Sequence, residues 1–322
     1  MRAAIPILAL VAATPSLIAA AGSGGGTAAS APEAATGGGR PEQTATAAAA
    51  ELESILREQK EFFDFLQKNA TAAPATDATT GATLGATTGT AAIFENAKEL
   101  RARSLMARYE NFIAAHPDEP AVIVLYAKFL RLIDARELAN RWFEKADKLL
   151  PDTAVIKEQL GAFAAEEGRP AQALPLLERA VALAPETAVY HYRLGEFLAA
   201  CQPALVAAKT LTRAECDARM LAAFAAAARL APGEAGYAWR HAESFLDCEK
   251  PNWVLALAAW DKIAARTEKP LLREAVSLHR ARALIGLGRK TEARRLLSAS
   301  RAPELSASRA RLSALLAKKE EK

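Results

Sequence analysis

Side chains that usually carry catalysis or bind metals are scarce in this chain. Its 322 residues include three cysteines and four histidines, and aromatic residues make up 6%. No two histidines stand four residues apart, as two ligands on one face of a helix would, so a zinc site is not expected. The chain also lacks a G-x-S-x-G elbow and a glycine-rich phosphate loop that follows a strand. We therefore expect no enzymatic activity, no metal and no cofactor.

An excess of charge of one sign is also missing. The chain has 41 Lys and Arg against 37 Asp and Glu, a formal net charge of +4. Both signs are interspersed from residue 95 onward, without the basic stripe that nucleic acid binding needs. Alanine is abundant, and because alanine favours helices and lets their axes approach closely, we expect an all-α protein without nucleic acid as a partner.

The first residues, "MRAAIPILALVAATPSLIAAAGSGGG", have one early charge, an apolar stretch and a small-residue end. This pattern predicts a signal peptide at residues 1–21, cleaved near Ala21, and a periplasmic or secreted protein. An uncleaved membrane anchor is the alternative, since about 20 apolar residues can also span a bilayer. Pro6 and Pro15 interrupt the run and favour cleavage. We expect membrane attachment only without cleavage.

Two segments, residues 22–50 and 70–92, consist mostly of small and polar residues. They offer too little apolar surface to offset the entropy of ordering, so we expect disorder in the first and a flexible linker in the second. Between them, residues 51–69 repeat large apolar residues every three or four positions, as in Ile55 and Phe62, which predicts an amphipathic helix. Self-association through this helix and packing on the folded domain or a membrane surface are both open.

Prolines recur at a fixed interval along the rest of the chain. Pro117, Pro151 and Pro185 are 34 residues apart, and Pro232 follows after 47, which is one interval plus an insertion of 13. Counting back 12, 8 and 5 residues from each proline gives apolar residues in fixed positions: Leu105, Tyr109 and Phe112; Ala139, Phe143 and Ala146; Ala173, Leu177 and Ala180; Met220, Phe224 and Ala227. The small residues let two helices touch, and the proline ends the second helix.

The first helix of each unit carries Leu160 and Gly161, then Leu194 and Gly195. With the Ala positions and the closing proline, the pattern resembles the tetratricopeptide repeat family. The resemblance implies a right-handed superhelix of helix hairpins over residues 93–322, an α-solenoid whose first helices line a concave groove. It implies a scaffold that binds a protein or peptide. An enzyme accessory or carbohydrate-binding surface is the alternative.

The resemblance also places residues in the groove. The positions of the family's concave face, with two arginines beside them, give a candidate partner-binding site: Val124, Lys128, Arg131, Glu158, Tyr192, Arg193, Glu196, Trp239, Arg240 and Glu243. Two segments, "YHYRLGE" and "YAWRHAE", share a pattern that would align Tyr192 with Trp239 and Arg193 with Arg240 as a ladder. Such residues are frequent in binding hot spots. The alternative is packing between repeats, with Arg–Glu pairs one helical turn apart on each helix.

The insertion, "CQPALVAAKTLTRAEC", departs from the repeat pattern. Its "TRAE" from Thr212 to Glu215 predicts a capping box that begins a longer second helix. Export would allow a disulfide, and Cys201 with Cys216 would close this loop. Cys201 with Cys248 is a second pairing, and three free buried cysteines are equally consistent with the sequence.

Overall fold

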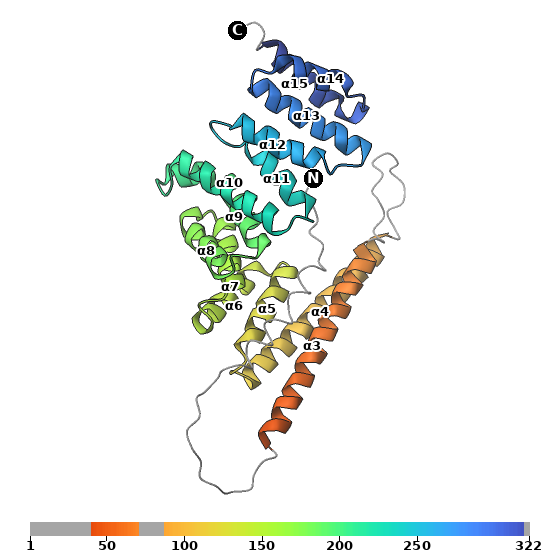
Figure 1. Cartoon of the computed structure of the whole chain (residues 1–322). Coiled ribbons are helices and arrows are strands. Elements are labelled where there is room, and N and C mark those ends of the chain that lie inside the picture. Colours follow the sequence, from red (N-terminus) through yellow and green to blue (C-terminus); the bar gives the residue numbers. More distant parts are fainter. Residues whose placement is uncertain (1–39, 71–86, 319–322) are drawn as a thin grey trace. The chain divides into compact units, whose positions relative to one another are not determined.

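The computed structural model describes residues 40–70 and 87–318, and these residues form helices and no β-strand (Figure 1). The all-α prediction is confirmed for this part of the chain. The predicted signal peptide at residues 1–21 lies outside the described residues, as do residues 22–39 and 71–86 of the two segments expected to lack order. Within the described ranges, no helix is long and apolar enough to span a membrane.

The chain divides into two compact units that meet in the sequence at Pro151 and Asp152. The described part of unit 1 consists of four consecutive helices, each packed on the next: α3 (Arg40–Ala70), α4 (Thr87–Ala115), α5 (Pro120–Leu132) and α6 (Arg136–Leu149). The predicted repeat domain at 93–322 is therefore divided between units, and the helix predicted at 51–69 belongs to the first of them.

Helix α3 is longer than the sequence indicates. It begins at Arg40, so its first turns lie in the segment 22–50 that we expected to be disordered. The alanines from 47 to 50 explain the difference, because alanine extends a helix at little cost once neighbouring turns are formed. At the other end of the predicted linker, helix α4 begins at Thr87 rather than after residue 92.

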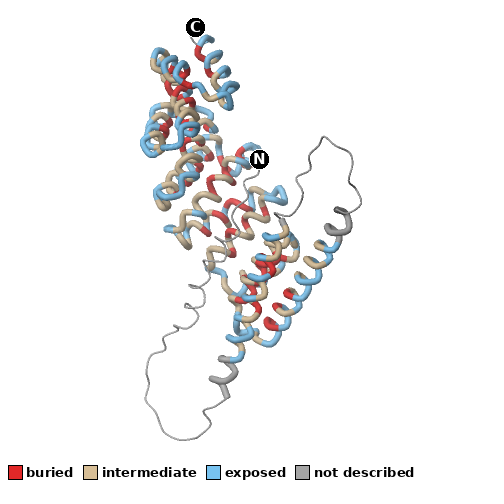
Figure 2. Tube along the Cα trace, turned by 90° about the vertical axis from the view of Figure 1, so that its right-hand side faces the viewer, coloured by how far each residue is buried: buried red, intermediate tan, exposed pale blue. Residues whose placement is uncertain are grey.

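The apolar stripe of α3 is buried within unit 1 (Figure 2). Ile55 is fully buried and Phe62 is 2% exposed. Phe62 and Phe63 both pack edge-on against Phe129 of α5, with ring centroids 6.0 and 6.2 Å apart. The stripe thus packs on the chain's own helices, which removes the unpartnered apolar face on which the prediction of self-association depended.

Helices α3 and α4 form a pair that the sequence did not predict. Helix α4 spans the start of the predicted repeat domain as one helix, and it packs on α3, which precedes that domain. Tyr109 of α4 donates a hydrogen bond from its hydroxyl to Gln59 of α3 at 2.7 Å, and Arg108 forms an ion pair with Glu58. The one polar position in the stripe of α3, Gln59, is explained by the buried tyrosine that it satisfies.

Unit 2 is a series of helix hairpins. Its helices are α7 (Ala154–Glu166), α8 (Pro170–Leu183), α9 (Ala188–Ala207), α10 (Arg213–Leu230), α11 (Ala235–Ser244), α12 (Trp253–Ala264), α13 (Pro270–Gly286), α14 (Lys290–Ala299), the short 3₁₀ helix η1 (Pro303–Leu305) and α15 (Ser306–Lys318). From α7 to α15 each α-helix packs on the next α-helix, and α15 contacts both α13 and α14. Residues 303–318 thus form η1 and α15, and α15 packs on the last hairpin.

The predicted repeat positions are the buried ones. Ala173, Leu177 and Ala180 of α8 are at most 4% exposed, and Met220, Phe224 and Ala227 of α10 at most 1%. These residues lie on the side of the second helix that faces the first. The prolines at 185 and 232 each follow two residues after a helix ends, as predicted.

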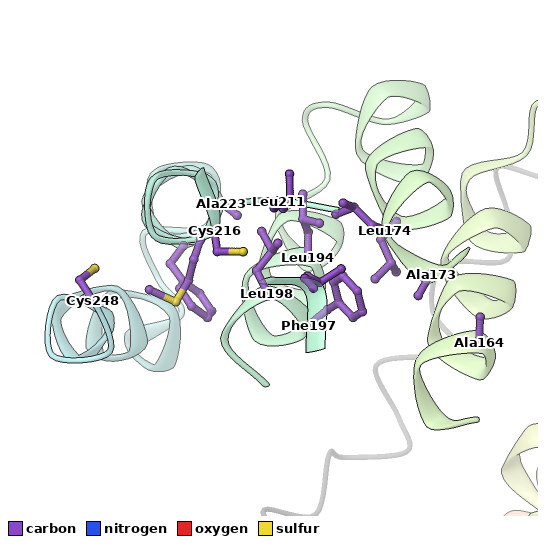
Figure 3. Close-up of a cluster of buried hydrophobic side chains, with 14 residues drawn as sticks. Ala164, Ala173, Leu174, Leu194, Phe197, Leu198, Leu211, Cys216, Ala223 and Cys248 are labelled. Atoms are coloured by element: carbon purple, nitrogen blue, oxygen red, sulfur yellow. The ribbon is translucent and has the colours of Figure 1, made fainter. Parts of the chain in front are cut away.

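Helices α9 and α10 meet at a glycine. A Cβ atom on Gly195 would lie 2.7 Å from the ring of Phe224, so only glycine lets the ring approach α9 this closely. Around this contact, Leu194, Leu198 and Cys216 join one buried apolar cluster (Figure 3). Leu194 and Gly195 of the first helix and Phe224 of the second therefore pack together in one contact between the two helices.

Candidate binding face on α9 and α11

The packing of Phe224 also positions a charge. The guanidinium of Arg240, on α11, lies over the Phe224 ring at 4.4 Å from its centroid. A cation over an aromatic face is stabilised by the ring quadrupole. The contact between Gly195 and Phe224 in one hairpin therefore supports an arginine from the next.

Arg240 is held by two carboxylates. It contacts Glu196 of α9 at 2.6 Å and Asp247, just beyond α11, at 2.9 Å. Its side chain is 19% exposed, whereas those of Glu196 and Asp247 are 44% and 45% exposed. The pair between Arg240 and Glu196 joins the first helices of two successive hairpins, and the carboxylates keep part of their surface open to solvent.

A second arginine reaches back in the same direction. Arg193 of α9 lies 3.8 Å from Glu158 of α7, and the Glu158 side chain is 8% exposed. This distance is too long for a hydrogen bond. Since the side chain of Arg193 is 42% exposed, its guanidinium presents N–H donors to solvent beside a buried countercharge. The buried carboxylate of Glu158 thus stabilises the charge of Arg193, and it is not itself accessible to a partner.

Two tyrosines connect these arginines. Tyr192 of α9 stacks on Tyr237 of α11, with ring centroids 4.8 Å apart, and meets the edge of Phe224 at 5.7 Å. Burial raises the pKa of both hydroxyls, so both are protonated donors at neutral pH. Their partly exposed rings form an apolar area beside Arg193 and Arg240.

An open pocket of about 420 Å³ adjoins the Arg240 pair. It lies where the inserted residues make α9 and α10 longer, at 20 and 18 residues against 13 and 14 for α7 and α8. Its lining comes from both long helices and from α11 and the segment after it, and includes Glu196, Ala200, Gln202, Arg213, Arg240 and Asp247. The departure from the regular repeat therefore creates this pocket.

Asp217 of α10 fixes the wall of the pocket. Its carboxylate accepts hydrogen bonds from Gln202 of α9 at 2.7 Å and from Arg213 at 3.0 Å, and from the backbone N–H of Glu249 at 2.9 Å. Arg213 also donates to the carbonyl oxygen of Asp247. The predicted capping box is confirmed, because the Thr212 side chain accepts from the Glu215 N–H and the Glu215 carboxylate accepts from the Thr212 N–H. These bonds fix the pocket wall before any partner binds.

The helix starts repeat with the predicted period. Helices α5, α7 and α9 begin at residues 120, 154 and 188, and α6 and α8 at 136 and 170, so both series advance by 34 residues. Gly161 of α7 lies against Leu177 of α8, as Gly195 of α9 lies against Phe224 of α10. The described hairpins have the tetratricopeptide repeat fold. Gly168 and Gly288 have positive φ angles and begin the similar segments "GRPAQAL" and "GRKTEAR", each at the turn between the two helices of a hairpin.

Comparison with known proteins gives distant likenesses only. No protein-family model matches the chain, and no curated protein matches it in sequence. Among solved structures, YrrB, described as a TPR protein with an unusual peptide-binding site, has a TM-score of 0.49 at 13% identity over 66% of this chain and 98% of its own. The C-terminal part of a TPR repeat-containing protein from Cytophaga hutchinsonii has a TM-score of 0.47 at 13% identity, over 67% and 76% of the two chains. No functional conclusion rests on similarity this low.

The predicted tetratricopeptide groove residues do not all lie on an accessible surface. Val124 of α5, in unit 1, is 1% exposed and belongs to the core, so its assignment to the groove was wrong. Val122, Ile123 and Val124 are consecutive and all buried, so Val124 belongs to the part of α5 that packs inside unit 1. Lys128 and Arg131 are partly exposed on the same helix.

The predicted ladder is replaced by other contacts. Trp239 packs edge-on against Trp260, with ring centroids 4.9 Å apart, and its indole N–H donates a hydrogen bond to Glu243 at 2.7 Å. Trp239 and Glu243 therefore serve packing within the repeats. Tyr192 stacks on Tyr237 and not on Trp239. The pairs expected between Arg193 and Glu196 and between Arg240 and Glu243 are replaced by pairs to the preceding first helix. Sequence reasoning missed Tyr237, Arg213 and Asp247, although Arg213 lies in the insertion and Tyr237 begins the "YAWRHAE" segment.

The three cysteines are free thiols in the structure. The predicted bond between Cys201 and Cys216 is therefore not formed. Cys216 is buried in the apolar cluster of α9 and α10 (Figure 3). Cys201 is only partly buried and packs against this cluster. Burial raises the pKa of Cys248 to about 11, which keeps this thiol protonated and unreactive at neutral pH.

Proposed function

We propose that this protein is a non-enzymatic scaffold that binds a protein or peptide on the face formed by Arg193, Tyr192, Tyr237 and Arg240 and on the adjoining pocket. We name these four residues the α9–α11 face. Tyrosine and arginine dominate binding hot spots because they offer large contact area with few rotatable bonds, or a fork of donors. A preformed face loses little entropy on binding.

The single observation that carries the proposal is the exposure of the Arg193 side chain beside a buried carboxylate. This side chain is 42% exposed, lies 3.8 Å from Glu158, and stands beside a stacked tyrosine pair. A carboxylate or a backbone carbonyl of a partner can accept hydrogen bonds from this guanidinium while an apolar side chain packs on the tyrosines. The carbohydrate-binding alternative is less favoured, because the Trp239 ring is occupied by Trp260 and His279.

We further propose that the protein acts in the periplasm or outside the cell. Support comes from the N-terminal sequence alone, which has the order of a signal peptide. Cell fractionation combined with mass measurement of the mature protein tests this. A mature N-terminus near residue 22 in the soluble envelope fraction is expected, and an intact Met1 in the cytoplasm would contradict the proposal.

Charge reversal at Arg193 tests the binding face. The protein is affinity-purified from the envelope fraction as wild type, as Arg193→Glu and as the matched control Arg229→Glu, whose arginine is exposed on α10. A specific partner should be lost from Arg193→Glu, by about tenfold or more, and kept by the control. Equal recovery of every co-purified protein from the three samples would reject this face as the binding site.

A further inference from the structure

A second pocket, of about 210 Å³, lies between α13 and α15 and combines an apolar wall with two arginines. Leu246, Leu278 and Leu312 supply the apolar wall, and Arg282 and Arg311 lie at its rim. We name it the α13–α15 pocket. Helix α15 lies beside α13 and α14 at the C-terminal end of unit 2 (Figure 1).

Neither arginine has a countercharge among the described residues. Arg282 and Arg311 are exposed, and neither forms an ion pair or hydrogen bond with any residue in the part of the chain that the structure describes. The lining of the pocket contains no acidic residue. By contrast, Arg240 and Arg280 of the same unit each contact a carboxylate at 2.6 Å. The pocket therefore concentrates uncompensated positive charge around an apolar depression.

The pocket wall is rigid. Leu278 and Leu312 are 4% and 8% exposed and belong to one buried cluster that joins α13, α14 and α15. His279 stacks flat on Trp260, with ring centroids 4.1 Å apart. Burial, with the charge of Arg282 as a second cause, lowers the pKa of His279 to about 4. The imidazole is thus neutral at physiological pH and acts as part of the apolar wall.

We infer that the α13–α15 pocket binds a protein segment in which an apolar side chain is flanked by acidic residues. The apolar side chain would fill the depression between Leu278 and Leu312, and the carboxylates would accept hydrogen bonds from Arg282 and Arg311. Charge complementarity selects this occupant, because an arginine fork pairs with a carboxylate in a way that a neutral segment cannot match. The inference rests on the proposed scaffold function in that the occupant is a protein segment, but it concerns different residues.

The experiment uses a fluorescein-labelled, C-terminally amidated peptide in which leucine and glutamate alternate over six residues. Amidation removes the terminal carboxylate, so that any acidic recognition comes from side chains. Fluorescence anisotropy with the full chain should give saturable binding that weakens as salt is added. Peptides with glutamine in place of glutamate, or serine in place of leucine, should bind about tenfold more weakly.

Two double variants localise the binding. Arg282→Gln with Arg311→Gln should weaken binding of the alternating peptide about tenfold. Arg229→Gln with Arg266→Gln is the matched control, since it removes the same charge from exposed positions outside the pocket lining and should leave binding unchanged. All four side chains are exposed, so both variants should fold.

Other results would overturn the inference. Absence of saturable binding, equal binding of the glutamine peptide, or an equal loss in both double variants would each do so. Binding to vesicles of anionic phospholipid, with no binding to the peptide, would indicate a membrane contact instead. The Arg193→Glu variant separates the two proposals. It should bind the alternating peptide as tightly as the wild type does, even where it no longer binds a cellular partner at the α9–α11 face.

Discussion

Arg240 of α11 contacts Glu196 of α9 at 2.6 Å, so an ion pair joins the first helices of two successive hairpins. Arg240 also lies over the Phe224 ring, whose position depends on Gly195. A core contact and a surface charge pair are therefore coupled. In a repeat protein, where each unit is stabilised mainly by its neighbours, such a pair contributes to the interface between units.

A double-mutant cycle measures that contribution. Arg240→Gln and Glu196→Gln should each lower the free energy of unfolding by about 1 kcal/mol, and the double variant by less than the sum, with a coupling energy of roughly 0.5–1 kcal/mol. Urea unfolding at low and high salt provides the values. Strict additivity of the two substitutions would show that the pair contributes nothing to stability.

Gly195→Ala tests the close contact between α9 and α10. The new Cβ would lie 2.7 Å from the Phe224 ring, so we expect a loss of about 1–3 kcal/mol in unfolding free energy. Gly236→Ala on α11 is the control, because no heavy atom lies within 4 Å of its added Cβ. It should be neutral or stabilise by up to roughly 1 kcal/mol. Thermal unfolding that ranks the two variants the other way round contradicts the assigned packing.

His279 makes stability depend on pH. Burial lowers its folded-state pKa to about 4 from an ordinary value of 6.5. Between these pH values the unfolded chain binds a proton that the folded chain excludes, so stability should fall as the pH is lowered from 6.5 to 4. His279→Phe keeps a ring on Trp260 and removes this effect, which amounts to roughly 3 kcal/mol at most.

The measurement is urea unfolding of wild type and His279→Phe across this pH range. His241, whose pKa burial also lowers, remains in both proteins and leaves a residual slope of the same sign. A shallower slope in the variant is expected. Parallel curves for the two proteins would show that His279 titrates normally in the folded state.

Phe62→Ala tests the role of α3. Phe62 is 2% exposed and packs against Phe129 of α5, so its truncation should cost unit 1 roughly 3–5 kcal/mol. Glu61→Ala, at an exposed position on the same helix, is the control. The unfolding midpoint of the wild type should not depend on protein concentration. A midpoint that rises with concentration would support self-association through α3 instead.

The hairpins and their cores could be predicted from the sequence because both depend on local spacing. The prolines at 151, 185 and 232 each follow two residues after a helix ends, whereas Pro175 and Pro203 lie inside helices, so the regular spacing carries the prediction. The 34-residue interval between prolines therefore predicted helix ends, and the counted positions proved to be buried.

The contacts of the candidate site could not be predicted in the same way. The spacing within one helix suggested that Arg240 pairs with Glu243, but the register between helices brings it to Glu196 instead. That register depends on how successive hairpins pack on one another, which the spacing along one helix does not determine. For the same reason Tyr192 stacks on Tyr237, although Trp239 occupies the equivalent position in the sequence.

Photocrosslinking from the pocket of about 420 Å³ that adjoins the α9–α11 face tests the scaffold proposal most directly. A photoreactive amino acid replaces Ala200, which is exposed in the pocket lining, or Ala222, which is exposed on α10 outside that lining. Irradiation of living cells should give a discrete protein adduct from position 200 that disappears when Arg193→Glu is added, and none from position 222. Adducts that form equally from both positions, or that persist with Arg193→Glu, would contradict binding at this face.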